Sequence, residues 1–312
     1  MGENQPAPTV PGTLDELRGA TAGRRRTLLT GWFSFRDGEA TAGDVLAWRL
    51  VSERLDCWGV LHDTAWSPGF APGALHLADV DPAAYDQLLF VCGPAHGPRV
   101  AELHRRFSRC HRVAVDVSVV DPADPAVTGF HRVLPRDGPT GPSRTDLSVV
   151  AVLGDRPPVA GVILSGGQGE YGGRRRHSEL SATLTRWIGE RDCTPVEADT
   201  RLDTRDWRHC ATPEQLLALL ERLDIVLTTR LHGMVLALRV GTPVLAVDPV
   251  RGGAKVSAQA SALRWPALLQ TSEVTETALG QWWEWCLSPA GLAAARRRSR
   301  LLRHRRRSLR AG

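Results

Sequence analysis

Lysine is nearly absent from this sequence. Lys255 is its single lysine, and the other 38 of its 39 basic residues are arginines. A lysine kept against such a bias can mark a position that needs a compact ammonium group, although chance is the alternative. The six cysteines are scattered and never form a C-x-x-C pair, so neither a zinc site nor a disulfide scaffold is indicated. No apolar run is long enough to span a membrane, and the one after Arg24–Arg26 is too short for a signal peptide. We therefore expect a soluble, cytoplasmic protein.

Positive charge is concentrated near the C-terminus. The formal net charge is +5, but residues 296–310 contain nine arginines and no acidic residue, so the rest of the chain carries −4. Such an end can make weak contact with anionic surfaces, whereas a solvated helix end is the simpler interpretation. We predict no specific binding of nucleic acid.

Short apolar runs alternate with helical segments along the chain, which is typical of parallel α/β domains. With 312 residues, 42% of them hydrophobic, the chain is long enough for two such domains. Residues 134–146 contain three prolines and two glycines, which argues against a strand or helix interior and favours a linker. The predicted organisation is a flexible leader at residues 1–24, α/β domains at residues 25–145 and 146–290, and an arginine-rich helix or tail at residues 291–312.

The most informative motif is Thr228-Thr229-Arg230-Leu231-His232-Gly233. It joins a predicted buried strand at residues 224–227 to a predicted helix at residues 234–240. Ligands of open α/β sheets bind outside the carboxyl ends of the strands, so this turn places Arg230 and His232 at a candidate ligand site. A salt bridge for Arg230 and a helix cap for His232 are the structural alternatives.

Two further segments indicate an anionic ligand. A second predicted strand, residues 244–247, is followed by a glycine-containing loop that ends in Lys255, at the same sheet edge as Arg230. Residues 166–173 contain five glycines and precede Arg174–Arg176 and a predicted helix. Backbone N–H groups of such a loop, together with a helix N-terminus, bind anions. The loop lacks a closing Gly-Lys-Ser/Thr, and a solvated flexible loop is the alternative.

Together these segments resemble the polysaccharide pyruvyl transferase family. The resemblance rests on residues 228–233, the Gly-Thr-Pro-Val sequence at residues 241–244, Lys255, and Ala42-Gly43-Asp44 at a predicted helix start, and it extends over most of residues 27–290. It implies two Rossmann-like domains facing a cleft, as in GT-B glycosyltransferases. It also implies a transferase that moves the pyruvyl group of phosphoenolpyruvate onto two hydroxyls of a sugar or glycan acceptor, forming a ketal and releasing phosphate, with no cofactor and no metal.

This chemistry suggests a role for each candidate residue. His232 is the candidate general acid that protonates the methylene carbon of the donor. Asp44, and after it Glu39, are candidate bases for the acceptor hydroxyls, although an aspartate at a helix start commonly caps the helix. The donor's carboxylate and phosphate need cations and N–H donors, for which the candidates are Arg230, Lys255, Gly166, Gly167, Gly169 and Arg174.

Two alternative functions stay open at this point. A GT-B-type glycosyltransferase or epimerase would place the diphosphate of a nucleotide sugar at the same glycine-rich loop. A non-catalytic member of the fold would use the arginine-rich end for docking.

Overall fold

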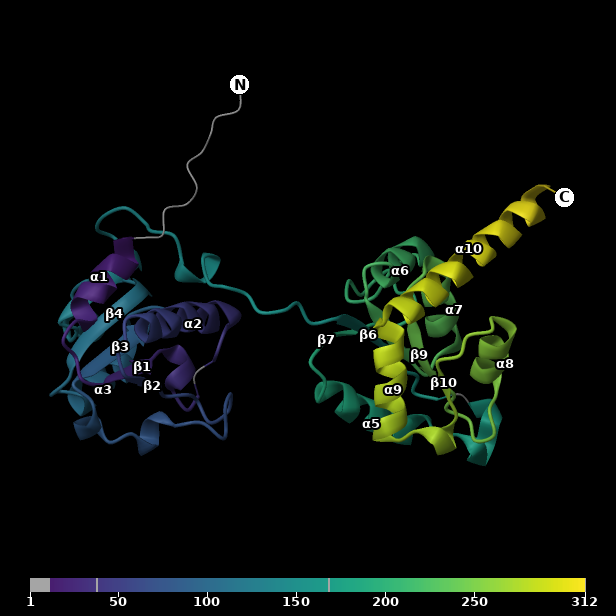
Figure 1. Ribbon diagram of the computed structural model, residues 1–312, viewed down its shortest axis with the longest axis horizontal. Coiled ribbons are helices and arrows are strands. Elements are labelled where there is room, and N and C mark those ends of the chain that lie inside the picture. The colour runs from purple at the N-terminus through teal and green to yellow at the C-terminus, as the bar shows by residue number, and fades with distance from the viewer. Residues whose placement is uncertain (1–11, 38, 168, 312) are drawn as a thin grey trace, which may run out of the picture. The chain divides into compact units, whose positions relative to one another are not determined.

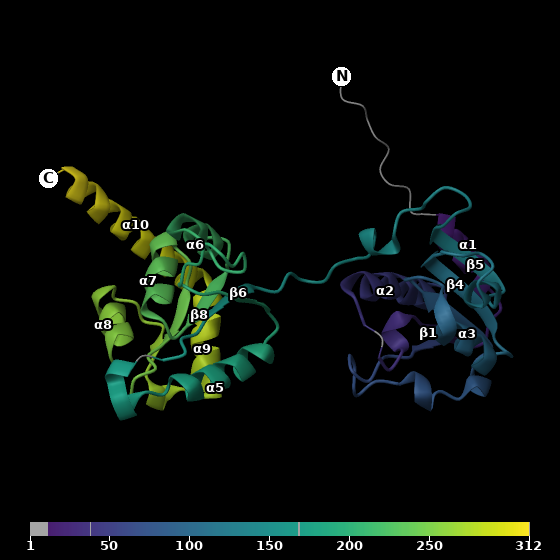
Figure 2. The same ribbon diagram turned by 180° about the vertical axis from the view of Figure 1, so that it is seen from behind.

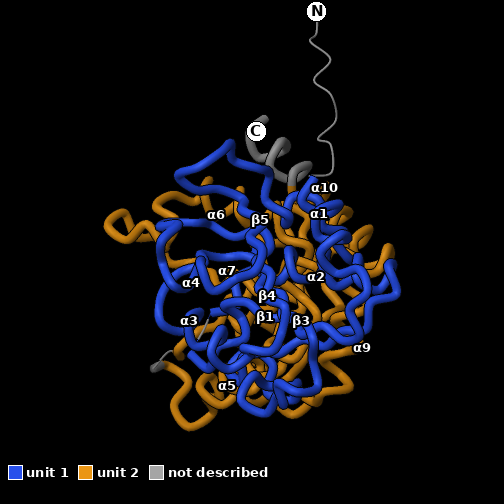
Figure 3. Tube along the Cα trace, turned by 90° about the vertical axis from the view of Figure 1, so that its left-hand side faces the viewer, with its two compact units in different colours: residues 1–154 blue, residues 155–312 orange. Residues whose placement is uncertain are grey.

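The computed structural model describes residues 12–37, 39–167 and 169–311, with side chains up to residue 302. The chain divides into two compact units, Met1–Gly154 and Asp155–Gly312 (Figure 3). Each unit contains a five-stranded parallel sheet flanked by helices (Figure 1). The prediction of an α/β protein with two Rossmann-like domains is therefore confirmed.

The sheet of unit 1 has the strand order β2-β1-β3-β4-β5, and every pairing is parallel. Its strands are β1 Thr27–Thr30, β2 His62–Thr64, β3 Gln87–Val91, β4 His111–Ser118 and β5 Arg132–Asp137. Its helices are α1 Gly12–Thr21, α2 Ala42–Cys57, α3 Gly97–Arg106 and α4 Pro125–Thr128, with short 3-10 turns η1 Trp32–Ser34, η2 Leu77–Asp79, η3 Pro82–Ala84 and η4 Leu147–Val149.

Both faces of this sheet are covered, which explains why its strands read as continuous apolar runs. Successive residues of β3 point to opposite faces. Leu88 and Phe90 belong to a core shared with α3 and α4, whereas Leu89 and Val91 belong to a core shared with α1 and α2. The loops that follow the strands lie at the carboxyl edge of the sheet.

The predicted leader is wrong for residues 12–21, which form helix α1. Leu14 is 4% exposed and Leu17 is fully buried, because both pack into the core of unit 1. The Pro, Gly, Ala and Thr composition of residues 1–24 concealed this short amphipathic segment. Residues 1–11 lie outside the described part of the chain.

The predicted linker at residues 134–146 is also wrong in part, because strand β5 runs through Pro135. A proline cannot donate a hydrogen bond to a neighbouring strand, but β5 is an edge strand and has a partner on one side only. Its pairing with β4 shifts register after Val115, so the strand is irregular where the proline lies. Unit 1 ends at Gly154, nine residues beyond the predicted domain boundary at residue 145.

The sheet of unit 2 has the strand order β10-β9-β8-β6-β7, again with parallel pairings throughout. Its strands are β6 Val159–Ile163, β7 Thr194–Glu197, β8 Ile225–Thr228, β9 Val244–Val247 and β10 Leu268–Leu269. Its helices are α5 His177–Gly189, α6 Pro213–Leu220, α7 Leu231–Val240, α8 Lys255–Ala262, α9 Glu276–Leu287 and α10 Pro289–Ala311, with 3-10 turns η5 Gly169–Arg174 and η6 Thr271–Glu273.

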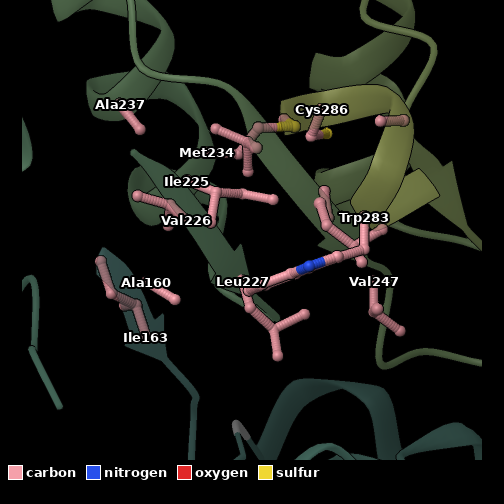
Figure 4. Close-up of a cluster of buried hydrophobic side chains, with 14 of the residues drawn as sticks. Ala160, Ile163, Ile225, Val226, Leu227, Met234, Ala237, Val247, Trp283 and Cys286 are labelled. Carbon is pink, nitrogen blue, oxygen red and sulfur yellow. The ribbon is translucent and has the colours of Figure 1, made fainter. Parts of the chain in front are cut away.

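The core of unit 2 gathers buried side chains from β6, β8, β9, α7 and α9 (Figure 4). Trp283 of α9 is 4% exposed and packs edge-on against Trp187 of α5. Helix α10 runs beside α7 (Figure 2), and Ser299 Oγ donates to the carbonyl of Arg239 at 2.7 Å. The first half of the predicted tail is therefore part of unit 2. The side chains of Arg303, Arg305–Arg307 and Arg310 lie outside the described residues.

The structure contains no helix, within the described residues, that is long and apolar enough to cross a membrane.

Helix α7 approaches the sheet of unit 2 closely at Gly233. A Cβ placed on Gly233 would collide with Thr228 Oγ1 and would lie 3.1 Å from Thr228 Cβ and 3.3 Å from Ile163 Cγ2. Thr228 Oγ1 cannot move freely, because it donates to the carbonyl of Ile163 at 2.7 Å and accepts from the N–H of Arg230 at 2.9 Å. Glycine at this position therefore fixes where the first turn of α7 lies.

We predict that Gly233→Ala lowers the free energy of unfolding by about 1–3 kcal/mol, the usual cost of overpacking a core contact. Gly280→Ala is the matched control, because the Cβ would meet nothing within 4 Å in helix α9. Alanine there should leave stability unchanged or raise it by up to about 1 kcal/mol, through its higher helix propensity. Urea unfolding followed by circular dichroism checks both values, and equal stability of the two variants would contradict the account.

Candidate active site

Four loops meet at the carboxyl edge of the unit 2 sheet, after strands β6, β7, β8 and β9. They enclose a cavity of about 250 Å³. The N–H of Ser165, after β6, donates to Thr229 Oγ1, after β8, at 2.9 Å and so ties two of the loops together. The lining residues include four of the predicted ones and several others: Gly167, Tyr171, His177, Thr200, Arg230, His232, Asp248 and Lys255. The structure thus brings Arg230, His232, Lys255 and Gly167 into one cavity.

Arg230 is the N-cap residue of α7 and has extended backbone geometry. Its Nη1 donates to Asp199 Oδ1 at 2.6 Å and to Thr200 Oγ1 at 2.9 Å, both in the loop after β7. The salt bridge considered from the sequence is therefore present. It uses one end of a guanidinium that is 31% exposed, and it holds this planar group at the cavity wall. Ion pairing and ligand binding are compatible here, because an arginine has five N–H donors.

His232 lies in the first turn of α7 and is exposed at the cavity. The next residue is Gly233, whose close contact with Thr228 positions this turn. The N-cap residue Arg230 makes no side-chain capping hydrogen bond, and Arg230, Leu231 and His232 at the start of α7 all line the cavity. His232 is therefore accessible to a small ligand.

Lys255 begins helix α8 and reaches toward the glycine-rich segment. Its Nζ lies 3.7 Å from Glu170 Oε1 and 6.0 Å from the ring centroid of Tyr171. Both partners belong to η5, so the ammonium group links the loop after β9 to the loop after β6. It remains 40% exposed at the cavity.

Asp248 organises the loop that carries Lys255, and it was not among the residues predicted from the sequence. Its buried carboxylate accepts hydrogen bonds from the N–H groups of Val250 at 3.0 Å, Ala254 at 2.7 Å and Ser257 at 2.9 Å. Ser257 Oγ donates to the same carboxylate at 2.6 Å. These bonds fold the turn at residues 249–254 and fix the start of α8. An aspartate directly after a buried strand was the available hint.

The glycine-rich segment contributes to the cavity through fewer residues than predicted. Gly167 lines it, with φ +108°, a conformation that other residues rarely adopt. Gly166 lines an adjoining cavity, and Gly169 begins η5 beside Gln168, which is outside the described residues. Arg174 lies over the ring of Tyr171 at 5.9 Å.

The arginines after the glycines are fixed to the loop after β9. The carbonyl of Arg174 accepts from the N–H of Arg251 at 2.9 Å, and the N–H of Arg176 donates to the carbonyl of Pro249 at 2.9 Å. The arginines that line the adjoining cavity are Arg175 and Arg176. The predicted role of Arg174 in donor binding stays a prediction, and its two neighbours are the better placed cations.

His177, like Asp248, was not predicted from the sequence. It begins helix α5, is 6% exposed, and lines both cavities. Its Nδ1 has no hydrogen-bond partner among the described residues, although an orphaned buried polar atom costs about 1–3 kcal/mol. Burial lowers the pKa of His177, the positive charges of Arg175 and Lys255 lower it further, and Asp248 and Glu170 oppose them. The imidazole is therefore neutral at neutral pH. A histidine at the end of a glycine- and arginine-rich loop was the signal available.

In unit 1, Asp44 and Glu39 line a separate cavity of about 600 Å³ together with Trp32, Thr41 and Arg99. Thr41 is the N-cap residue of α2 and Asp44 completes a capping box with it: Asp44 Oδ2 accepts from Thr41 Oγ1 at 2.7 Å and from the N–H of Thr41 at 3.3 Å. The capping role weighed from the sequence is thus present. Glu39 is exposed at the same cavity.

Beneath this cavity three potential metal ligands lie close together. Cys92 Sγ and carboxylate oxygens of Asp116 and Asp146 are within 4.8 Å of one another. The guanidinium of Arg136 already supplies a positive charge there, donating to Asp146 Oδ2 at 2.5 Å and lying 3.8 Å from Cys92 Sγ. Burial raises the pKa of Cys92 to about 12, so this thiol is protonated at neutral pH.

Asp116 provides a pH-dependent test of this cluster. Burial raises its pKa from 3.8 to about 6, helped by Asp146 and Asp137 and opposed by Arg136 and the N–H of Leu147. The folded state therefore holds the proton more tightly than the unfolded state, so stability falls as pH rises from about 4 through about 6. Asp116→Asn should remove this loss. Relative to the unchanged protein, its free energy of unfolding should rise by at most about 3 kcal/mol between pH 4 and pH 7.

Asparagine tolerates the positive φ of 59° at position 116. Asp121→Asn, an exposed change in the same unit, is the control and should show no such pH dependence. Thermal unfolding from pH 4 to pH 8 measures both variants. If the stability of Asp116→Asn changes with pH in the same way as that of the unchanged protein, the pKa of Asp116 is not raised in the folded state.

We also predict that Asp248→Asn destabilises the protein by about 2–4 kcal/mol, because an amide N–H₂ would face backbone donors in a buried site. Hydrogen exchange at the amides of Ala254 and Ser257 should become faster. Glu214→Gln on the exposed face of α6 is the control and should change stability by less than about 0.5 kcal/mol. Unchanged exchange at residues 254 and 257 would show that Asp248 does not fix the loop.

The chain was compared with solved structures, with curated proteins and with protein-family models. The chain has 13% identity to the spinosyn forosaminyltransferase SpnP, with 90% of this chain and 95% of that chain covered and a TM-score of 0.33. It has 12% identity to the E. coli heptosyltransferase WaaC with ADP, with 83% and 99% covered and a TM-score of 0.28. Such scores are too low to support a conclusion about fold or function. A search of curated proteins gives no match.

A family model gives the informative result. Residues 198–249 match the model described as polysaccharide pyruvyl transferase. The match begins after β7, next to Asp199, contains Arg230 and His232, and ends after β9, next to Asp248. It therefore covers the loops after β7 and β8 and the first two residues of the loop after β9. The resemblance found in the sequence is supported over this segment, where the chain is similar to the polysaccharide pyruvyl transferase family.

Proposed function

We propose that this protein transfers the pyruvyl group of phosphoenolpyruvate to two hydroxyls of a sugar or glycan acceptor. The observation that carries the proposal is the gathering of Arg230, His232, His177 and Lys255 around one cavity of unit 2, within and beside the segment that matches the family. No soluble cofactor is required by this reaction.

The cavity suits a small dianionic or trianionic donor. Phosphoenolpyruvate presents a carboxylate and a phosphate, and each needs cationic or N–H donors. Arg230 can offer the N–H groups that Asp199 leaves unused to the planar carboxylate, and Lys255 adds a point charge beside it. The carboxylate of Asp248 repels the ligand little, because it is buried and accepts four hydrogen bonds from its own loop.

The proposed reaction has two stages. His232 donates a proton to the methylene carbon of the donor, and the first acceptor hydroxyl forms a bond to C2 as it loses its proton. The bond between C2 and the phosphate oxygen then breaks, and the second hydroxyl bonds to C2 and closes the ketal. Two hydroxyl protons are released: one replaces the proton now in the new methyl group, and the other leaves with phosphate. No oxidant or reductant is consumed.

Within unit 1 we propose that Glu39 is a better base for an acceptor hydroxyl than Asp44. One carboxylate oxygen of Asp44 is engaged by the N-cap residue Thr41, whereas Glu39 is exposed at the cavity. Carboxylates and the indole of Trp32 are groups that bind sugar hydroxyls and sugar faces.

The test uses purified protein, phosphoenolpyruvate and panels of sugar and nucleotide-sugar acceptors. The phosphoenolpyruvate signal in ³¹P NMR should be replaced by inorganic phosphate, with a new ketal methyl signal in ¹H NMR of equal amount. Arg230→Ala should weaken donor binding by roughly 100-fold, because it removes a charge-assisted hydrogen-bonding partner. His232→Gln should bind the donor but lower kcat by about 100-fold or more, the usual contribution of a general acid.

Arg239→Ala is the matched control, because Arg239 is an exposed arginine in the last turn of the same helix α7. It should retain donor affinity and turnover. Consumption of a nucleotide sugar while phosphoenolpyruvate stays intact would overturn the proposal and favour a glycosyltransferase or epimerase. Unchanged donor binding by Arg230→Ala would remove Arg230 from the donor site.

A further inference from the structure

A second cavity adjoins the first at His177 and Gly167, which line both. It measures about 390 Å³ and is formed by the glycines of the segment after β6 and by the start of helix α5. Gly166, Gly172 and Gly173 have open space where a Cβ would stand. A ligand can therefore approach the backbone of this segment without meeting a side chain.

The start of α5 is built as an anion site. The helix has 13 residues, and its N-cap residue, Arg176, makes no side-chain hydrogen bond to the first-turn N–H groups. Such groups and the helix dipole attract anions. Arg175 and Arg176 line the cavity and add two positive charges, opposed by Glu179, whose Oε2 lies 3.6 Å from Arg176 Nε.

His177 gives an independent indication of a ligand. The side chain is 94% buried, yet its Nδ1 has no partner among the described residues. This nitrogen faces Gly167, since a Cβ placed on Gly167 would lie 3.8 Å from it. Buried imidazole nitrogens are normally hydrogen-bonded, so an unpartnered one directed at a cavity wall indicates a group that arrives from outside the chain.

We propose that the N-terminus of α5 and His177 form a phosphate subsite that takes a phosphate monoester dianion. Nδ1–H of His177 donates to one phosphate oxygen, and the first-turn N–H groups of α5 bind the others. The proposal rests on the proposed function in one respect: in the complete donor, this subsite holds the phosphate while Arg230 and Lys255 hold the carboxylate. His177 stands where the two cavities join, which suits a ligand with an anionic group at each end.

The charges around His177 predict how binding depends on pH. Arg175 and Lys255 disfavour a proton on the imidazole, while Asp248 and Glu170 favour one, and Arg176 and Glu179 lie beside the cavity. A bound phosphate dianion adds negative charge, which raises the pKa of His177. Phosphate binding near pH 6.5 should therefore be accompanied by proton uptake.

The experiment measures the two halves of the donor separately, by isothermal titration of the full chain with inorganic phosphate and with pyruvate. His177→Phe removes the donor nitrogen and keeps a planar ring, whereas His177→Asn keeps an N–H donor near the position of Nδ1. We expect His177→Phe to weaken phosphate binding at least tenfold and pyruvate binding less than twofold. His177→Asn should retain phosphate binding with less net proton uptake than the unchanged protein, as judged in buffers of different ionisation enthalpy; the proton that phosphate itself releases on binding as the dianion is common to both.

A second variant changes the two arginines at the cavity and leaves the buried His177 in place. Arg175→Ala with Arg176→Ala should weaken phosphate binding at least tenfold, whereas Arg186→Ala, in the last turn of the same helix, should not. The proposal is overturned if the unchanged protein does not bind phosphate, or if Arg230→Ala abolishes phosphate binding while His177→Phe and the double variant leave it unchanged.

Failure of the proposed function gives a different pattern. In that case phosphate still binds and responds to His177→Phe, but phosphoenolpyruvate is not consumed.

Discussion

The geometry of unit 2 depends on the buried carboxylate of Asp248. A parallel sheet brings the carboxyl ends of its strands to one edge, but it does not determine the shape of the loops that leave it. Asp248 determines one of them, because four hydrogen bonds to a single carboxylate fold residues 249–254 and fix the start of α8. The same loop is bonded to the arginines after the glycine-rich segment, through Pro249 and Arg251. The backbones of Lys255, Arg174 and Arg176 are therefore connected to one buried acidic group.

Helix α7 is positioned by a different kind of constraint. The absence of a side chain at Gly233 lets the helix lie directly against Thr228, whose hydroxyl joins Ile163 of β6 to Arg230. Arg230 is then held from the other side by Asp199 and Thr200. Ordering several cationic side chains around an anion costs entropy unless they are already held in place. Here hydrogen bonds or close packing hold them before the ligand binds. The cavity therefore suits rapid capture of a small anionic donor.

The sequence was sufficient to predict the strands and helices that carry the site. The spacing of apolar residues, and the glycines or prolines at the ends of elements, are local signals. The strand predicted at residues 244–247 matches the structure. Helix α1 and strand β5 were missed, since their stability comes from packing and from an edge position that composition does not reveal. The positions of Arg230, His232 and Lys255 after strands predicted that they would lie together at one sheet edge, and the structure places them in one cavity. His177 and Asp248 were missed, because burial of a polar side chain is a tertiary property that no sequence spacing shows.

A crystal structure of the protein bound to phosphoenolpyruvate tests the central claim most directly, namely that the cavity of unit 2 is the donor site. We predict a carboxylate within hydrogen-bonding distance of the Arg230 guanidinium and a phosphate at the first turn of α5, against His177 Nδ1. Phosphoenolpyruvate bound elsewhere, or a cavity that takes a nucleotide diphosphate and excludes phosphoenolpyruvate, would contradict the account.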